Sequence, residues 1–235
     1  MSSLTLLQTA TTSHSDRPER ILQELIQNDL VRRVLEEVES NAALADQIAM
    51  NSYWHSTGIF KLVLWKPPGN TPEVRLHIWS QRSRDFSVTH VDSIHNHRWN
   101  FASEILAGDF LKELFITDNT DSNDHRHFRF ESQGRGQPNR VTHLGDVTTR
   151  TSFMTTLRRG GRYYLDSRIL HRITPSNNDL SATLFVSSPN LFTFSDVLFS
   201  QGSKRPDGQQ PPATKLKPDL IISLLADLRA EINRN

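Results

Sequence analysis

The chain of 235 residues contains no cysteine. This absence excludes disulfide bonds, thiolate zinc sites, iron–sulfur clusters and cysteine nucleophiles. Any metal ion that protein side chains bind must therefore be held by histidine, aspartate or glutamate.

An excess of charge of one sign is also lacking, because 27 Lys and Arg face 26 Asp and Glu. Nucleic acid is not an expected partner, since proteins that bind its phosphate backbone usually carry a clear basic excess. No stretch approaches the ~18 apolar residues of a membrane span, and residues 1–12 lack the charged start of a secretory signal. We therefore expect a cytoplasmic protein without a membrane partner.

The two ends of the chain have helical patterns and polar connections. Residues 1–15 are rich in Ser and Thr without periodicity, so we expect them to be disordered. Residues 16–57 show apolar positions at helical spacing, broken near Asn28 and Asp29. A Pro/Gly/Lys-rich linker is predicted over 199–218, followed by a helix over 219–235 that Asp219 can cap.

Between residues 58 and 198 the period changes to two. The runs 59–65, 73–79, 110–116 and 181–186 are rich in β-branched, aliphatic and aromatic residues, and turn signals separate them. We find no internal repeat, and the length suits one domain. The pattern favours an antiparallel sandwich or barrel over alternating strands and helices.

Ten histidines are present, and two of them form the motif His95-Asn96-His97. On a strand, residues i and i+2 project from the same face, so both imidazoles can reach one metal ion. The spacing alone is weak evidence. His125-Arg126-His127 repeats it inside a polar segment, where we interpret the histidines as solvated.

The surroundings of His95 and His97 are more specific. Ser93-Ile94-His95-Asn96-His97 is followed by Gly108 and residues 111–115, and this resembles the first motif of the cupin superfamily, more narrowly of the thiol dioxygenases. Downstream, the segments 164–167 and 170–173 resemble the second motif of that family. The resemblance covers residues 58–190. It implies a mainly β cupin fold, an antiparallel jelly-roll barrel over 58–198, with helical segments at both ends.

By the same resemblance, the metal ligands are His95, His97 and His171. Many cupins place a glutamate ligand seven residues before the motif glycine, but this chain has Phe101 there. Glu104 lies three residues further on, so on a strand it would face the other way. A site of three histidines without a carboxylate follows, as in the thiol dioxygenases.

This ligand set leaves the identity of the metal open. Imidazole suits zinc, copper, iron and nickel alike, and iron(II) with O2 as co-substrate enters through the resemblance. The leading hypothesis is a non-haem iron oxygenase acting on a small amino-acid-like, amine or thiol substrate. The alternatives are a zinc, manganese or nickel cupin with isomerase or lyase chemistry, and a ligand-binding cupin. The expected partner is the small-molecule substrate, and a homodimer stays open.

A small acid also needs a cation for its carboxylate. In the family an arginine on an early strand binds it, and the candidates here are Lys61 on the corresponding strand, Arg75 on the next strand and Arg98. Phe101 is a candidate wall residue of the substrate pocket or simply part of the barrel core.

Further candidates surround the ligands. His77 shares a strand face with Arg75 and is either a pocket residue or a hydrogen-bonded core histidine. Asp166 and Arg172 flank His171, and we expect them either to support the ligands through hydrogen bonds or to be a turn aspartate and a surface arginine. Tyr164, in the second motif, is a further residue that we expect to support the ligands.

The chain also departs from the family pattern. Where the thiol dioxygenases carry a Ser-His-Tyr relay after the third ligand, this chain has Thr183, Phe185 and Ser187. No cysteine is available for the thioether cross-link of some members. Cysteine oxidation by the family mechanism is therefore not expected.

Overall fold

The computed structural model describes residues 1–55, 57–82, 93–118, 123–133, 139–176, 180–203 and 214–234. Its helices are α1 (Ser3–Ser13), α2 (Pro18–Gln27), α3 (Leu30–Ser40), α4 (Ala42–Asn51) and α5 (Pro218–Arg234). Its strands are β1 (Tyr53–His55), β2 (Ile59–Trp65), β3 (Glu73–Trp79), β4 (Ile94–His95), β5 (Phe101–Ala107), β6 (Phe110–Asp118), β7 (His125–Glu131), β8 (Arg140–Leu157), β9 (Arg162–Leu165), β10 (Leu170–Pro175), β11 (Ser181–Ser187), β12 (Phe194–Ser200) and β13 (Thr214–Lys215).

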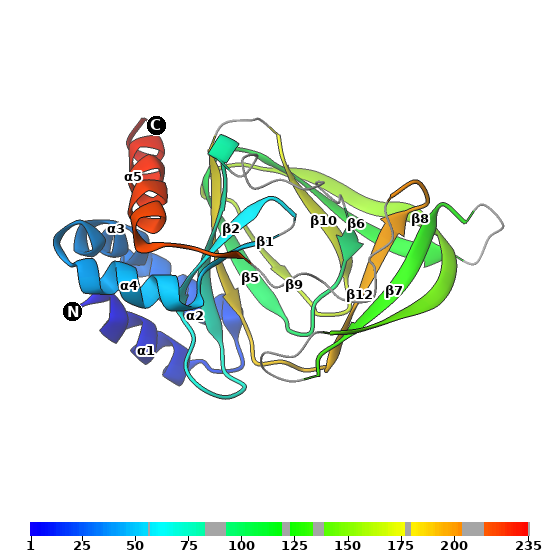
Figure 1. Ribbon diagram of the computed structural model, residues 1–235, viewed down its shortest axis with the longest axis horizontal. Coiled ribbons are helices and arrows are strands. Elements are labelled where there is room, and N and C mark those ends of the chain that lie inside the picture. The colour runs from blue at the N-terminus through cyan, green and yellow to red at the C-terminus, as the bar shows by residue number, and fades with distance from the viewer. Residues whose placement is uncertain are drawn as a thin grey trace.

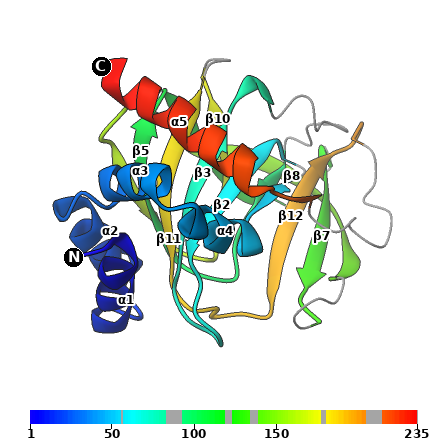
Figure 2. The same ribbon diagram turned by 60° about the vertical axis from the view of Figure 1, so that its left-hand side comes forward.

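The helices gather on one side of the β-structure (Figure 1), where α5 contacts α3 and α4 (Figure 2). The predicted break after α2 is confirmed, because Asp29 adopts a left-handed φ of 53° between α2 and α3. None of the described helices has the length and apolar character that crossing a membrane requires.

The expectation of a disordered start over residues 1–15 is wrong. Residues Ser3–Ser13 form α1, and Ser2 caps it by accepting a hydrogen bond from the amide of Thr5. Leu6, Leu7 and Ala10 are almost fully buried in the main core. The Ser/Thr content concealed this short apolar stripe, which tertiary packing stabilises as a helix.

Seven strands form one antiparallel sheet in the order β13-β1-β2-β3-β11-β5-β9. One face of this sheet packs against the helices, and we call it the outer face. Its apolar side chains join those of the helices in one core, which includes Phe60, Leu62, Leu76, Ile78, Leu184, Leu25, Ile48 and Leu225. Each such fully buried side chain contributes about 1.5–3 kcal/mol. The opposite, inner face is therefore left for the candidate site.

The other six strands pair in the order β10-β4-β12-β7-β8-β6, and β6 also pairs with β10, so this sheet closes on itself. Closure depends on the long strand β8, whose first half pairs with β7 and whose second half pairs with β6. Side chains of this sheet meet the inner face of the first sheet, as the rings of Phe110 and Trp79 show at 5.0 Å.

The predicted mainly antiparallel β-barrel with helices at both ends is confirmed: all strand pairs of the described residues are antiparallel, and one sheet closes on itself. The boundaries differ slightly from the prediction. The strands extend from Tyr53 to Ser200 rather than from 58 to 198, and the final helix begins at Pro218. Part of the predicted linker forms β13, which pairs with β1, and its residues 204–213 lie outside the described part of the chain.

Gly108, the glycine of the first motif, is required by its conformation and by its surroundings. Its φ is +73°, and a Cβ there would lie 2.9 Å from the Cβ of Ser181 and 3.2 Å from its Cα. We expect Gly108→Ala to lower the free energy of unfolding by about 2–5 kcal/mol, since left-handed strain and overpacking add. Urea unfolding measures this loss.

Gly69→Ala is the matched control, because Gly69 has a φ of +90°, but a Cβ added there would meet no atom within 4 Å. Gly69→Ala should lower the free energy of unfolding only by the left-handed strain, about 1–2 kcal/mol. Equal losses in the two variants would show that contact with Ser181 does not matter.

Candidate metal centre

His95, His97 and His171 converge on the inner side of the barrel. His95 of β4 and His171 of β10 are directly paired in neighbouring antiparallel strands. The three ring centroids lie 4.8–5.0 Å apart, and one potential ligand atom from each residue lies within 4.8 Å of the other two. The grouping that the two sequence motifs predicted is therefore present.

Backbone carbonyls orient two of the rings. The Nδ1 atom of His95 lies 3.1 Å from the carbonyl oxygen of Ser93, and that of His171 lies 3.1 Å from the carbonyl oxygen of Ile169. A carbonyl only accepts, so Nδ1 carries the proton in both rings and Nε2 keeps its lone pair for a metal ion.

His97 lies just beyond the end of β4, and hydrogen bonds on both sides hold its segment. Its amide donates to the carbonyl oxygen of Ser167 at 3.2 Å. The neighbouring Asn96 exchanges two hydrogen bonds with Asp196 of β12, where Asn96 Oδ1 accepts from the Asp196 amide at 2.6 Å and the Asn96 amide donates to the Asp196 carbonyl. The middle residue of the motif thus fixes its two histidines.

The electrostatics favour neutral imidazoles. Burial lowers the pKa of all three histidines, to about 3 for His171 and well below the usual value for His97, where the neighbouring imidazoles add to the effect. Because a metal binds the neutral ring, no proton has to leave these side chains near neutral pH. The donor set therefore fits a metal ion.

Within the described residues, no carboxylate joins the three histidines. Phe101 stands at the position of the usual glutamate ligand, and its ring centroid lies 5.1 Å from that of His97 and 5.5 Å from that of His171. Glu104 faces the other way, into a cleft that Leu35 of α3 and Ile232 of α5 also line. This arrangement agrees with the sequence prediction.

Aromatic side chains form the wall around the histidines. Phe185 stacks on Phe101 at 4.8 Å, and Trp99 stacks on His97 at 5.4 Å with 11° between the ring planes. Thr183 and Ser187 share the inner face with Phe185, because alternate residues of a strand point the same way. The predicted replacement of the relay is therefore located beside the site.

His77 lies in this wall, but it does not touch the candidate ligands. Its ring stacks on Phe185 at 4.7 Å, and Phe185 in turn lies 6.5 Å from the His97 ring. Of the two interpretations of His77, the pocket residue is favoured over the hydrogen-bonded core histidine, since its buried Nε2 atom has no hydrogen-bond partner among the described residues.

The three candidate anchors differ in their pairing. Arg75 is buried and lies 2.6 Å from a Glu73 oxygen, and Lys66 contacts the other oxygen at 3.1 Å. Arg98 lies over the Trp99 ring at 5.4 Å. Lys61 lies 5.9 Å from the Tyr53 ring, and burial lowers its pKa to about 7. Arg75 thus already has a counter-charge, whereas Lys61 has no acidic partner among the described residues.

The expectation that Tyr164 supports the ligands is wrong. Its side chain is 46% exposed, because Tyr164 pairs with the outward-facing Ala102. The inward residue is Tyr163, whose ring centroid lies 5.8 Å from that of Phe101. Burial raises the pKa of Tyr163 to about 12, with an opposing effect of its hydrogen bond to Ser103. The alternation of inward and outward side chains along β9 indicates Tyr163, whereas the resemblance to the second motif pointed to Tyr164.

Asp166 and Arg172 form hydrogen bonds with residues other than the candidate ligands. Asp166 Oδ1 accepts hydrogen bonds from the backbone amide and the side chain of Arg168, both at 3.0 Å. Arg172 donates to Glu113 at 2.6 Å, on the strand face opposite His171. Backbone carbonyls, rather than these residues, orient the rings of His95 and His171.

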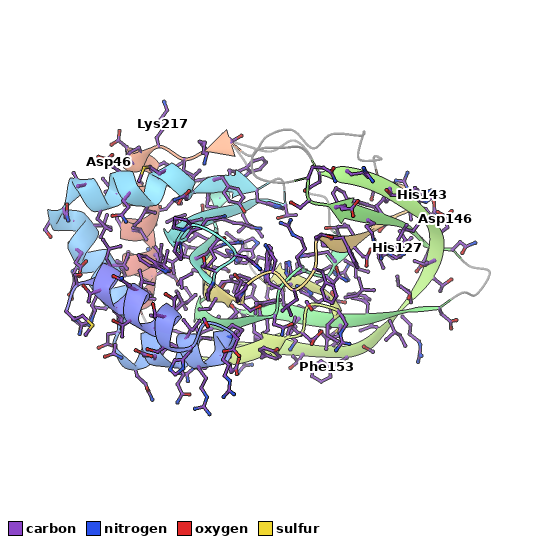
Figure 3. All side chains as sticks on the ribbon, turned by 90° about the horizontal axis from the view of Figure 1, so that it is seen from below. Asp46, His127, His143, Asp146, Phe153 and Lys217 are labelled. Carbon is purple, nitrogen blue, oxygen red and sulfur yellow. The ribbon has the colours of Figure 1, made fainter. Side chains whose placement is uncertain are left out.

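The second His-x-His pair is not solvated as expected. His125 and His127 lie on β7 with side chains 14% and 23% exposed, and each contacts a carboxylate, Asp124 at 3.0 Å and Asp196 at 3.3 Å. Figure 3 shows His127 and His143 at the end of the β-structure away from the helices. The pairing of β7 with β8 and β12, which the sequence did not reveal, places both histidines within the closed sheet. Neither histidine belongs to the three-histidine group.

No family model and no curated protein matches this chain. Among solved structures, hydroquinone 1,2-dioxygenase from Sphingomonas sp. TTNP3 is similar at 14% identity, covering 61% of this chain and 71% of that chain with a TM-score of 0.33. A protein from Shewanella oneidensis is 11% identical and covers 80% and 93%, with a TM-score of 0.32. A cupin-like protein from Thermotoga maritima MSB8 is 11% identical and covers 55% and 68%, with a TM-score of 0.26. The narrower resemblance to thiol dioxygenases stays a prediction, and the chemistry of the site is inferred from its own residues.

Proposed function

We propose that this protein is a mononuclear non-haem iron(II) oxygenase of the cupin fold, with a small metal-bound substrate and O2 as co-substrate. One observation carries the proposal: three neutral imidazoles, that of His171 buried and the other two half-buried, converge without a carboxylate among the described residues. His95, His97 and His171 would hold the ion. Iron(II), when bound, supplies the redox chemistry with O2.

The protein's own residues would position the substrate and exclude water. Neutral ligands leave the full charge of the ion available to an anionic substrate group, which lowers the cost of desolvating that group. Phe101, Phe185 and Trp99 supply a largely apolar wall beside the ligands. Such a wall strengthens electrostatic interactions within the site.

Free cysteine is expected to be a poor substrate. Phe185 offers apolar surface where the relay histidine would form hydrogen bonds, and apolar walls discriminate by only ~1–3 kcal/mol per methylene. A bulkier carboxylate would suit this wall better than cysteine does.

Metal analysis combined with oxygen uptake tests the proposal. Protein purified from iron-supplemented cells, or reconstituted anaerobically with Fe(II), should retain iron stoichiometrically. An oxygen-electrode screen of small thiols, amines and amino acids should find at least one compound that drives O2 uptake, with cysteine among the weak ones. Nitric oxide, used as an oxygen surrogate in EPR, should report which compounds perturb the iron signal.

A non-redox cupin is the second candidate, because imidazole ligands accept zinc, manganese and nickel as well. Tight retention of one of these metals, together with no O2 uptake by the iron-reconstituted protein, would favour it and refute the oxygenase.

A further inference from the structure

Lys112 is a buried cation on the inner side of β6 that sequence reasoning missed. Phe110 and Leu114, two residues away on the same face, contact Trp79 and the aromatic wall respectively. Lys112 is 8% exposed, and its Nζ atom lies 5.0 Å from the centroid of the Tyr163 ring. Among the described residues it has aromatic neighbours but neither a hydrogen bond nor an ion pair.

Lys61 is the corresponding cation on the opposite sheet. It lies on β2, directly paired with His77 of β3 and with Tyr53 of β1. The only acid near this part of the described wall is Glu73, which Arg75 and Lys66 already neutralise. Lys61 thus contributes a second amino group, which is about half protonated at pH 7 because its pKa is lowered to about 7, and it has no counter-charge in the described part of the chain.

Both lysines border the aromatic wall around the candidate ligands. Lys61 is paired with His77, whose ring stacks on Phe185 at 4.7 Å. Lys112 lies beside Tyr163, whose ring centroid is 5.8 Å from that of Phe101. A metal ion would add further positive charge. Lys112 is buried and Lys61 is half-buried. Charges removed from water without a partner are costly, so the site favours a ligand that brings negative charge to both lysines.

Two further polar atoms of the wall lack partners within the described residues. Trp99 Nε1 and His77 Nε2 are buried and form no hydrogen bond there. The indole N–H can only donate, and the imidazole can donate in one tautomer. The polar atoms left over in this wall are therefore mainly donors, which suits a ligand rich in oxygen acceptors.

We propose that the substrate of this centre carries two anionic groups, one bound by Lys61 and the other by Lys112, as in a small dicarboxylic acid. The inference rests on the proposed function in that it concerns the substrate of the same site. Charge-assisted hydrogen bonds to two separated ammonium groups would fix the length and orientation of the molecule relative to the ion.

Binding to the full-length wild-type protein gives the first test. Isothermal titration of the metal-free and the zinc-loaded protein would compare the dicarboxylates from malonate to adipate with their monomethyl esters, which lack one charge. At least one diacid should bind about 10-fold or more tightly than its monoester, the effect of one charge-assisted hydrogen bond. Equal affinities across every pair would overturn the proposal.

The variants assign the two groups. Lys112→Met and Lys61→Met should each weaken diacid binding about 10- to 100-fold and bring it close to monoester binding, whereas Lys112→Arg should retain the preference. Lys217→Met is the control, because Lys217 is exposed and lies beside the helices (Figure 3). Unchanged diacid binding in a folded Lys112→Met protein would overturn the role of Lys112. If the methionine variants do not fold, Lys→Gln variants and the wild-type comparison still decide.

The outcomes separate this inference from the proposed function. Diacid binding without O2 uptake by the iron-loaded protein would refute the oxygenase and leave the two-lysine site standing. Oxygen uptake driven by a monoanionic or neutral compound, with no preference for diacids, would refute the two-lysine site alone.

Discussion

Alanine at position 95, 97 or 171 is expected to strip the metal from the protein. Each substitution removes one of three imidazole ligands, and no carboxylate among the described residues can replace it. Loss of a hydrogen-bonding partner of a ligand already costs 10- to 100-fold in metal affinity. Loss of the ligand itself should therefore exceed about 100-fold, which metal analysis after dialysis against a weak chelator would detect.

His125→Ala and His127→Ala are the matched controls. They remove histidines with the same His-x-His spacing, but these contact Asp124 and Asp196 and lie outside the three-histidine group. Both variants should retain the metal, and circular dichroism would show that all five proteins are folded. Equal metal retention in the five would place the metal elsewhere in the chain.

Glu73→Gln should produce the largest loss of stability among single substitutions near the site. Glu73 and Arg75 are 7% and 5% exposed, and their side chains lie 2.6 Å apart. The variant leaves the guanidinium of Arg75 buried without its counter-charge, which typically costs about 3–5 kcal/mol. Urea unfolding at pH 7 would measure it.

The same pair predicts a dependence on pH. Arg75, and then Lys66, lower the pKa of Glu73 to about 2 against the opposing effect of burial. A carboxylate with a lowered pKa stabilises the fold above its unfolded value of 4.5 and loses this contribution as the pH falls toward about 2. The wild-type protein should therefore lose stability faster than Glu73→Gln in this window.

Glu131→Gln serves as the control for both measurements. Glu131 contacts Arg140 at 3.6 Å, and both side chains are exposed, at 39% and 66%. Exposed pairs contribute only about 0–1 kcal/mol. If Glu73→Gln lowered the free energy of unfolding by as little, water would have to hydrate the unpaired guanidinium of Arg75.

The strands were predictable because they depend on local spacing, and the three-histidine group was predictable because the resemblance to the two cupin motifs implied it. A period of two marks a strand in any sequence, and the two motifs carry His95, His97 and His171 together with the glycine that β5 and β6 need between them. The absence of the carboxylate ligand followed from counting back to Phe101. The strand pattern needs no knowledge of how distant segments meet, and for the histidines the resemblance supplied that knowledge.

What sequence reasoning missed depends on contacts between distant segments. Lys112 looked like an ordinary strand lysine, and only the pairing of β6 with β10 places it near His171. Glu73 neutralises Arg75 and so leaves Lys61 without an acidic partner among the described residues, which no spacing rule shows. Likewise, α1 is a helix because Leu6 and Leu7 have partners in the core.

The shortness of β4 affects how the closed sheet would open during unfolding. Only Ile94 and His95 belong to this strand, yet it lies between β10 and β12 and pairs with both in the closed sheet. An ion held by both His95 and His171 would cross-link β4 and β10, which are paired only at these two residues. Separation of β4 from β10 would then release the ion. Because the ion binds only the folded protein, the melting temperature should rise with the concentration of free metal.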